Sequence, residues 1–321
     1  MMSRADGRSA VVTLGTFDGV HRGHQALLKR ARERARARGI ESAALTFRKP
    51  PRNYLGTPKP LLLPPEKKLE LLGRFVERVV VLDFPRVREW SPREFVEAVL
   101  VRDLHAQVVV VGENFRFGRD RRGDESTLRT LGKELGFEVE VVESVRVDGE
   151  VVSSTAIRRA IRAGEVERAA RLLGRPPQLW GRVVPGSGQG RRLGFPTANL
   201  SVDPEMLVPA EGIYAAWALF RGEKRPGALY IGRRPTLGEG EALSVEVYIV
   251  GLPEETSLYG VELEVQLLAR IREDRRFDSL EALKAQIARD VARTREFFAK
   301  RYGLEASERD GQLTQTDPAY G

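Results

Sequence analysis

The 321-residue sequence contains no cysteine, which excludes disulfide bonds, thiolate metal sites and thiol nucleophiles. Histidine is almost as scarce, with three residues in all. No apolar run approaches the roughly 18–20 residues that a membrane-spanning helix requires, and the first six residues hold no apolar signal core. We therefore expect a cytoplasmic protein with no membrane contact and no thiol chemistry.

The chain carries a formal net charge of +8, which could indicate a nucleic-acid partner. Five of its arginines occupy alternate positions between residues 30 and 38 of a predicted helix, so we expect them to spread around the helix surface. A site for a highly charged nucleotide accounts for the excess charge equally well. We expect no nucleic acid as a main partner.

The first half of the chain alternates strand-like and helix-like segments, which is typical of an α/β Rossmann-like domain with a parallel sheet. Ligands of such folds bind at the carboxyl ends of the strands. The expected strands are Ala10–Leu14, Ser42–Phe47, Val79–Leu82, Gln107–Val111 and Glu138–Val142, and the expected helices are Gln25–Arg38, Glu66–Arg74, Pro92–Val101 and Ser126–Leu135.

The second half has a different character. Two short predicted helices, Thr155–Arg162 and Val166–Leu173, end before the prolines at 176 and 177, where we place a domain boundary. The strand-like segments that follow are separated by glycine and proline turns, which indicates an antiparallel barrel or sandwich closed by one helix. The expected segments are strands Tyr214–Phe220, Ala228–Ile231, Leu243–Val250 and Val261–Ala269, and a helix from Asp278 to about Tyr302. The predicted domains are residues 1–175 and 176–302, with a flexible tail at 303–321.

Residues 15–24 read Gly-Thr-Phe-Asp-Gly-Val-His-Arg-Gly-His, directly after the first predicted strand. Amides at a helix N-terminus attract anions, and glycines let the main chain approach phosphate oxygens. We expect His21 and His24 to bind nucleotide phosphates. A metal-binding pair and a pair of buried structural histidines remain alternatives, although neither a cysteine nor a third histidine lies nearby, and His105 stands alone.

Two further segments support a phosphate site. Residues 112–118 follow the apolar strand of residues 108–111, at the same expected edge of the sheet. Residues 153–158, Ser-Ser-Thr-Ala-Ile-Arg, combine hydroxyls at a helix start with an arginine one turn later, which suits an oligophosphate. The alternative for Ser154 and Thr155 is a plain helix cap.

Residues 11–24, 112–118 and 153–158 together resemble the nucleotidyltransferase half of the prokaryotic bifunctional riboflavin kinase/FAD synthetases. The resemblance implies transfer of AMP from ATP to FMN. The FMN phosphate is already anionic, so we expect the two histidines, with Arg158 and Mg²⁺, to stabilise charge and not to act as a general base. The implied residues are Gly15, Phe17, His21, His24, Ser154, Thr155 and Arg158 for ATP, with His21 and His24 catalytic, and Asn114 and Phe115 for the flavin.

One turn departs from that family. The family usually carries Phe-x-Pro-His-Pro after the second strand, whereas residues 47–51 here read Phe-Arg-Lys-Pro-Pro. The resemblance therefore does not extend its flavin or phosphate contacts to this turn.

The second half contains a glycine-rich run at residues 186–194 that continues into Phe-Pro-Thr-Ala-Asn. Residues 194–199 resemble the riboflavin kinase signature, and the resemblance implies a β-barrel that phosphorylates riboflavin with ATP. By that resemblance Thr197 and Asn199 hold Mg²⁺, for which oxygen ligands are suitable. The implied ATP-binding residues are Gly190, Arg191, Gly194, Pro196, Thr197 and Asn199.

Phosphorylation of a primary alcohol gains from a base that accepts the proton of the hydroxyl. Glu246 is the one acid of the strand segment 244–248, and the catalytic glutamate of the family occupies the matching strand. We therefore predict Glu246 as the base, and a solvated, outward-facing strand position is the alternative. Tyr230 stands where the family often has asparagine, and we expect a structural role for it.

The sequence is thus predicted to encode an enzyme that makes FMN from riboflavin and FAD from FMN, with ATP and Mg²⁺ in both reactions. Three alternatives remain open: an enzyme with only one of the two activities, a basic nucleic-acid-binding or regulatory protein, and a class I aminoacyl-tRNA synthetase-like enzyme. The last lacks support from a lysine-rich loop of the kind that those synthetases carry. Self-association of the chain is left open.

Overall fold

The computed structural model describes residues 8–235, 241–253 and 255–304. Most of the predicted tail, residues 305–321, lies outside this range. The chain divides into two compact units, one made of residues 1–156 with 172–174 and the other of residues 157–171 with 175–321. The domain boundary that the sequence predicts at residue 175 stays a prediction. Of the helical segment before it, residues 157–171 group with the second unit and residues 172–174 with the first.

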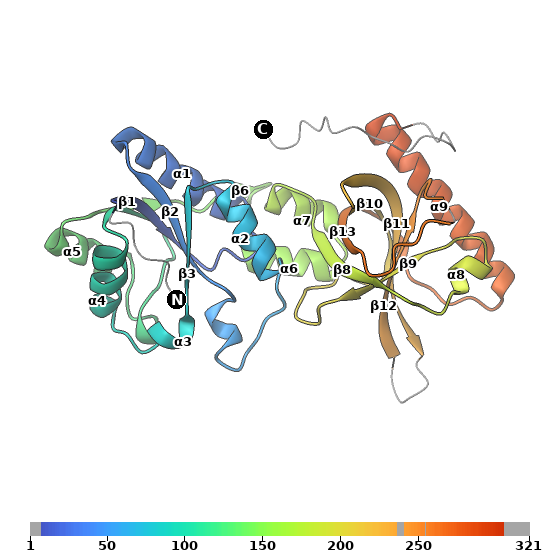
Figure 1. Ribbon diagram of the computed structural model, residues 1–321, viewed down its shortest axis with the longest axis horizontal. Coiled ribbons are helices and arrows are strands. Elements are labelled where there is room, and N and C mark those ends of the chain that lie inside the picture. Colours follow the sequence, from blue (N-terminus) through green and yellow to red (C-terminus); the bar gives the residue numbers. More distant parts are fainter. Residues whose placement is uncertain (1–7, 236–240, 254, 305–321) are drawn as a thin grey trace. The chain divides into compact units, whose positions relative to one another are not determined.

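The first unit is built on a five-stranded parallel sheet in the order β3-β2-β1-β4-β5 (Figure 1). The order places β1 at the centre, so the segment that follows β1 leaves the middle of the carboxyl edge. The strands are β1 (Ala10–Leu14), β2 (Glu41–Phe47), β3 (Arg78–Leu82), β4 (Ala106–Gly112) and β5 (Glu138–Val142), with a separate hairpin of β6 (Arg146–Val147) and β7 (Glu150–Val151). The helices of this unit are α1 (Arg22–Arg38), α2 (Pro65–Gly73), α3 (Phe84–Val87), α4 (Pro92–Phe95), the π-helix Val96–Asp103 and α5 (Glu125–Leu135), with 3₁₀ turns at Pro51–Asn53 and Arg119–Arg121. Helices α6 (Ser154–Arg162) and α7 (Val166–Leu173) belong mostly to the second unit.

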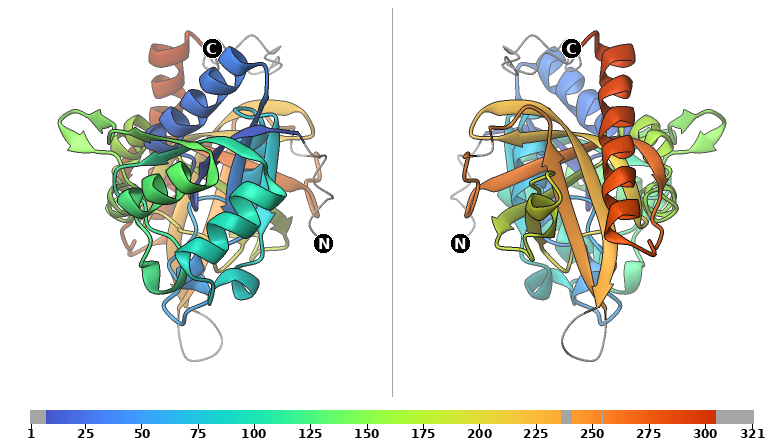
Figure 2. Two further views of the ribbon diagram at one scale, coloured as in Figure 1. Left: turned by 90° about the vertical axis from the view of Figure 1, so that its left-hand side faces the viewer. Right: turned by 90° about the vertical axis from the view of Figure 1, so that its right-hand side faces the viewer.

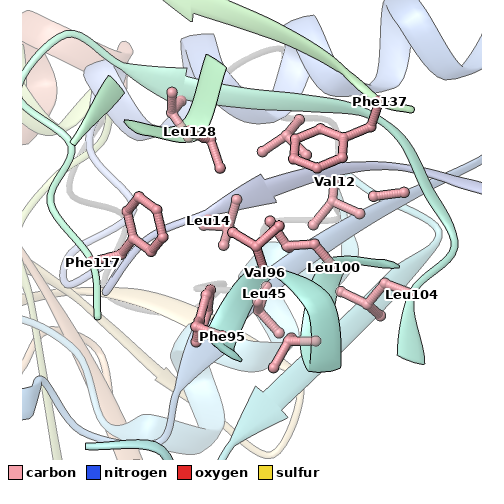
Figure 3. Close-up of a cluster of buried hydrophobic side chains, with 14 of the residues drawn as sticks. Val12, Leu14, Leu45, Phe95, Val96, Leu100, Leu104, Phe117, Leu128 and Phe137 are labelled. Atoms are coloured by element: carbon pink, nitrogen blue, oxygen red, sulfur yellow. The ribbon is translucent and has the colours of Figure 1, made fainter. Parts of the chain in front are cut away.

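Both faces of this sheet are covered, as the continuous apolar run of β4 predicts. Val12 and Val109 face a large cluster that includes residues of α4, the π-helix and α5 (Figure 3). Their neighbours Val11 and Val108 pack with Ala31 and Ala35 of α1 on the opposite side. The doubly wound architecture expected from the sequence is confirmed.

One expected helix has an unexpected form, and one local expectation was wrong. The segment after Ser91 begins as the predicted capped helix, but it continues as a π-helix in which the Leu104 amide donates to the Val99 carbonyl five residues back. The arginines of α1 do not all spread around the helix. Residues 30, 34 and 38 lie four apart on one face and pair with Glu138 and Glu140 of the edge strand β5.

The second unit is a closed antiparallel barrel in the order β10-β11-β12-β9-β8-β13, which settles the choice between barrel and sandwich. Its interior is filled by alternate side chains of each strand, including Tyr214, Leu229 and Val247. The elements are β8 (Gln178–Val184), α8 (Gln189–Arg192), β9 (Ala198–Val202), β10 (Gly212–Phe220), β11 (Glu223–Pro235), β12 (Glu241–Ile249), β13 (Glu262–Glu273) and α9 (Leu280–Tyr302).

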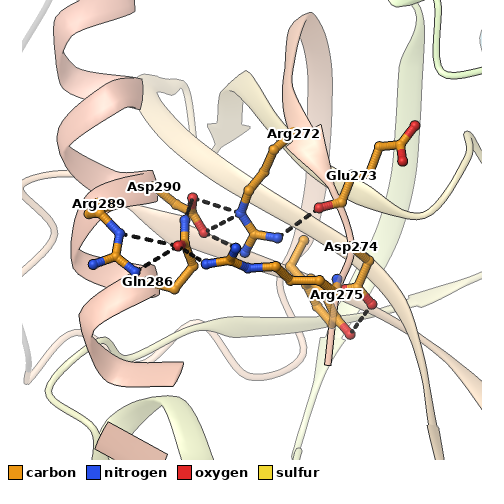
Figure 4. A network of polar contacts seen from close by, with 8 residues as sticks. Arg272, Glu273, Asp274, Arg275, Gln286, Arg289 and Asp290 are labelled. Carbon is orange, nitrogen blue, oxygen red and sulfur yellow. Dashed lines mark hydrogen bonds and ion pairs between the residues drawn. The ribbon is translucent and has the colours of Figure 1, made fainter. Parts of the chain in front are cut away.

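Helix α9 packs on the outer wall of the barrel, along β10, β11 and β13 (Figure 2). Its apolar contact is made by Phe298 against Trp217, with ring centroids 4.6 Å apart. Its polar contact is the pair of Arg272 and buried Asp290, which Gln286 extends within the helix (Figure 4). These contacts attach the helix to one fixed face of the barrel.

Candidate active sites

The segment that joins β1 to α1 has an unusual backbone. Phe17 and Val20 adopt left-handed φ angles of 48° and 40°, and Gly19 has φ 84°. Such values are unfavourable for residues other than glycine, so the surrounding structure must impose them. The Phe17 side chain is fully buried, packs against Gly15 and meets the His24 ring edge-on. In this structure Phe17 therefore orders the segment, and its ring is not available to a ligand.

The two histidines lie together at the start of α1. Their rings stack with centroids 3.5 Å apart and an interplanar angle of 17°. His21 is the N-cap residue, because its Nδ1 accepts a hydrogen bond from the His24 amide at 3.3 Å. A neutral His21 must then carry its proton on Nε2, which makes Nε2 a potential donor. The stacked pair thus places two imidazole groups beside the main-chain amides of a helix N-terminus.

Asp18 fixes this segment from two sides. Its carboxylate accepts a hydrogen bond from the Leu62 amide at 3.0 Å, and its main-chain carbonyl accepts one from the Ser154 hydroxyl at 3.0 Å. Leu62 and Ser154 are 44 and 136 residues away in sequence. Their contacts bring the predicted phosphate segment and the start of α6 together.

The three hydroxyls at the start of α6 have different environments. The hydroxyl that caps α6 belongs to Ser153, which accepts from the Ala156 amide at 3.2 Å. Ser154 is instead used to bond Asp18, and Thr155 is exposed at the first turn. Arg158 follows one turn later on the same helix and is only 7% exposed. Of the hydroxyls of Ser153, Ser154 and Thr155, that of Thr155 belongs to the exposed residue.

The segment after β4 contains the predicted flavin-binding residues. Asn114 is exposed at the carboxyl end of β4. Phe115 is partly buried against the core cluster and stacks on Phe117, with centroids 5.4 Å apart. Asn114 is thus presented to solvent, whereas the Phe115 ring is shared between the core and the surface.

In the second unit, Glu246 lies on β12 and is 5% exposed. Its Oε2 accepts a hydrogen bond from the Thr197 hydroxyl at 2.9 Å, and its Oε1 accepts one from the Ser244 hydroxyl at 2.7 Å. The alternation of β12 directs Val245 and Val247 into the barrel, so Glu246 lies on the outer face. Glu246 is nevertheless buried on that face, which contradicts the alternative of a solvated strand position.

Asn199 lies beside this carboxylate because β9 pairs with β12, with Asn199 opposite Glu246. On the other side of β12, Tyr230 of β11 stands opposite Glu246 as well. Cross-strand partners share one face of a sheet, so the three side chains form a row on the outer wall. Tyr230 donates its hydroxyl hydrogen to Asp274 at 3.3 Å.

The glycine-rich run before Thr197 folds into the short helix α8. A side chain at Gly186 would collide with the Asn199 amide group. A side chain at Gly190 would come within 2.5 Å of the Phe195 carbonyl and 3.0 Å of the Thr197 hydroxyl. These glycines permit the close approach of the loop to the row. The other predicted ATP-binding residues of this loop, Arg191 and Gly194, are exposed, and Pro196 is partly buried.

Ser244 is a site residue that sequence reasoning missed. It lies two positions before Glu246, and on a strand this spacing places both side chains on the same face. The spacing of two residues on a strand was therefore the sequence signal that could have identified Ser244. It went unused because serine is common at exposed strand positions.

Comparisons with known proteins agree with both units. The FAD synthetase family model matches residues 3–156, and the riboflavin kinase family model matches residues 173–298. A bifunctional riboflavin kinase/FMN adenylyltransferase of Pseudomonas fluorescens is 42% identical over 301 residues, which span 92% of this chain and 95% of the relative. The protein of the same description from Escherichia coli K12 is 38% identical over 302 residues, with the same two coverages.

A solved structure is similar over nearly the whole length. A crystal structure named as a macrolide-efflux protein from Streptococcus pneumoniae matches with a TM-score of 0.82 and 32% identity, covering 90% of this chain and 94% of that one. In the part of the present chain that the structure describes, no helix is both long enough and apolar enough to cross a membrane.

Proposed function

The chain belongs to the family of bifunctional riboflavin kinase/FMN adenylyltransferases, and from that premise we propose how its residues divide the two reactions. The enzyme phosphorylates riboflavin to FMN and adenylylates FMN to FAD, with ATP as the co-substrate of each step. We assign the kinase to residues 176–302 and the adenylyltransferase to residues 1–175.

In the kinase reaction Glu246 accepts the proton of the primary hydroxyl of riboflavin as its oxygen attacks the γ-phosphate of ATP, and the bond from the γ-phosphate to ADP breaks to release ADP. The hydroxyls of Thr197 and Ser244 hold the carboxylate in one orientation. The observation that carries this proposal is the 2.9 Å bond from Thr197 to Glu246, because it joins the proposed metal ligand directly to the proposed base. Gly190, Arg191, Gly194 and Pro196 are assigned to the ATP-binding loop.

Mg²⁺ belongs to the kinase proposal. The Thr197 hydroxyl donates its hydrogen to Glu246, which leaves oxygen lone pairs for a cation, and the Asn199 amide offers a second oxygen. Within the described residues no group of three or more His, Cys, Asp or Glu is arranged to hold a metal. When bound, Mg²⁺ neutralises charge that develops on the transferring phosphate.

In the adenylyltransferase the attacking group is the FMN phosphate, which is already ionised and needs no base. His21 and His24, with the amides at the start of α1, are assigned to the charge on the α-phosphate and the leaving pyrophosphate. Gly15, Thr155, Arg158 and the main chain of Phe17 are assigned to ATP. Ser154 fixes the loop through Asp18, and Asn114 and Phe115 are assigned to the flavin. We retain the cytoplasm as the predicted location, and self-association remains a prediction for sedimentation to test.

The deciding experiment incubates the purified chain with riboflavin, ATP and Mg²⁺, and separates the flavins by chromatography. We expect FMN to appear first and FAD to follow, and FMN supplied alone with ATP to give FAD. Formation of FMN with no FAD from either substrate would establish the single-activity alternative.

A further inference from the structure

Helix α2 contains a buried lysine that neither reaction has used. Lys68 is 3% exposed, and its Nζ donates to three main-chain carbonyl oxygens: Phe47 at 2.5 Å, Arg48 at 3.1 Å and Thr16 at 3.4 Å. These carbonyls lie at the carboxyl ends of two neighbouring strands. Thr16 follows β1, Phe47 is the last residue of β2, and Arg48 follows it. The lysine therefore joins the edge of the sheet on which the phosphate segment begins.

A buried ammonium is costly unless its hydrogens are satisfied, and a leucine or methionine would fill the same volume at lower cost. Burial lowers the pKa of Lys68 from its ordinary 10.5 to about 8. The nearby Asp18 carboxylate opposes this lowering, and the Arg48 guanidinium adds to it. Packing alone therefore does not account for a buried ammonium group at this position.

The contacts of Lys68 supply that reason. Thr16 immediately precedes Phe17, the first residue of the strained backbone that leads to His21. Its carbonyl also accepts from the Thr46 hydroxyl at 3.3 Å, so Thr16 is held from β2 as well as from α2. The other two carbonyls open the turn in which this chain departs from its family. One cationic group thus sets the positions of two loops at a site that must bind polyphosphate.

We propose that Lys68 is a positioning residue for FMN adenylylation, whose ammonium group ties the loops after β1 and β2 together and thereby fixes the phosphate-binding segment of residues 15–24. The inference rests on the proposed function of the first domain. It assigns Lys68 no contact with substrate: the lysine acts through Thr16 and the backbone that follows. Lys68 should accordingly affect adenylylation and leave the kinase unchanged.

The test uses the full chain with two substitutions, Lys68→Met and Lys68→Gln. Methionine keeps the volume and donates nothing, whereas glutamine keeps two N–H donors without a charge. For FAD formation from FMN and ATP, we expect kcat/KM to fall about 10- to 100-fold in Lys68→Met, with KM for ATP raised, because small misplacements of reacting groups are costly. We expect Lys68→Gln to recover part of this loss.

The pH profile separates positioning from mere folding. Because kcat/KM reports ionisations of the free enzyme, the wild type should lose adenylylation as the pH rises through about 8, and the variants should lack this step. Lys67→Met is the matched control, since Lys67 is the adjacent lysine, is partly exposed and pairs with Glu70 at 3.7 Å. It should retain wild-type kinetics and the wild-type profile.

Two results would overturn the inference: wild-type kcat/KM in Lys68→Gln, or a step near pH 8 that persists in it. If Lys68→Met does not fold, Lys68→Gln alone decides by the same criteria. FMN production by the same samples reports that the chain is intact. A wild-type chain that makes no FAD at all would instead contradict the proposed function, so the two failures are distinguishable.

Discussion

Each domain contains a buried carboxylate next to its proposed phosphate site, and the two accept hydrogen bonds from different kinds of donor. Asp18 is 4% exposed and Glu246 is 5% exposed, so burial does not tell them apart. Asp18 accepts from the main-chain amide of Leu62, whereas Glu246 accepts from the hydroxyls of Thr197 and Ser244. A main-chain amide fixes a carboxylate in place, while hydroxyls can rotate to new partners when a proton arrives. The donors, and not the burial, distinguish Asp18 from the proposed base Glu246.

The difference follows the chemistry of the two nucleophiles. A phosphate needs no base, so the first site can use its aspartate to hold a strained loop and can present imidazoles and helix amides. An alcohol gains from a base, so the second site places a carboxylate on a rigid strand beside the proposed metal ligands.

The largest effect expected is that of Glu246→Gln on the kinase. The amide keeps the shape but accepts no proton, so kcat for FMN formation should fall about 10²- to 10⁴-fold. FAD formation from supplied FMN should be unchanged. The matched substitution is Asp18→Asn, which keeps an oxygen for the Leu62 amide and should reduce FAD formation only about tenfold or less. Equal losses from both substitutions would break the comparison.

The next effect is that of His24→Ala on FAD formation. Removal of one group that stabilises transition-state charge typically lowers kcat by about 10²- to 10³-fold. Kinase activity in the same sample is the control, and FAD production at a near wild-type rate would remove His24 from the site. His105→Ala, at the connection before β4, should change neither reaction by more than about twofold, as expected of a position away from both sites.

The sequence predicted the fold well where the pattern was regular. Strands Ala10–Leu14 and Glu138–Val142 have the predicted bounds, because each is a short apolar-rich run between clear boundaries. Strands β8 and β9 were not predicted, since β8 is interrupted by Gly181 and the first two residues of β9 belong to the motif of residues 194–199. The π-helix was not predictable either, because its pattern of residues is that of an ordinary helix.

The sites were predicted less completely, and for a physical reason. A motif identifies residues that are close in sequence, such as His21 and His24, whose stacking follows from a spacing of three on a helix start. The contacts that fix the loops join distant segments, as between Asp18 and Leu62 or Lys68 and Phe47. For Lys68 a weak signal existed: it lies four residues before buried Leu72, on the same face of α2.

A third prediction concerns the stability of the first domain as a function of pH. Below pH 8 Lys68 is protonated in the folded and the unfolded chain, and its burial penalty is fully present. Between pH 8 and 10.5 the unfolded chain binds more protons than the folded chain, so the free energy of unfolding rises with pH. The wild type should gain about 3 kcal/mol relative to Lys68→Met over this interval.

Urea unfolding followed by circular dichroism at a series of pH values measures this difference. Subtraction of the Lys68→Met curve removes the titrations common to both proteins. If the difference in the free energy of unfolding stays constant from pH 7 to 11, Lys68 has an ordinary pKa in the folded chain. The loops of the first site would then not depend on the charge of Lys68.

The smallest effect tests whether Tyr230, the third member of the row on the barrel wall, takes part in the kinase reaction. Tyr230 stands opposite Glu246 and donates to Asp274, so Tyr230→Phe removes one hydrogen bond and should cost about 1 kcal/mol of stability. If its role is structural, as the sequence suggested, kcat for FMN formation should stay within about twofold of the wild type. Asp274→Asn keeps an acceptor for the tyrosine hydroxyl and serves as the control.

A loss of kinase activity in Tyr230→Phe but not in Asp274→Asn would mean that the Tyr230 hydroxyl acts on Glu246 or on the substrate. The second site would then use side chains from three neighbouring strands, β9, β12 and β11.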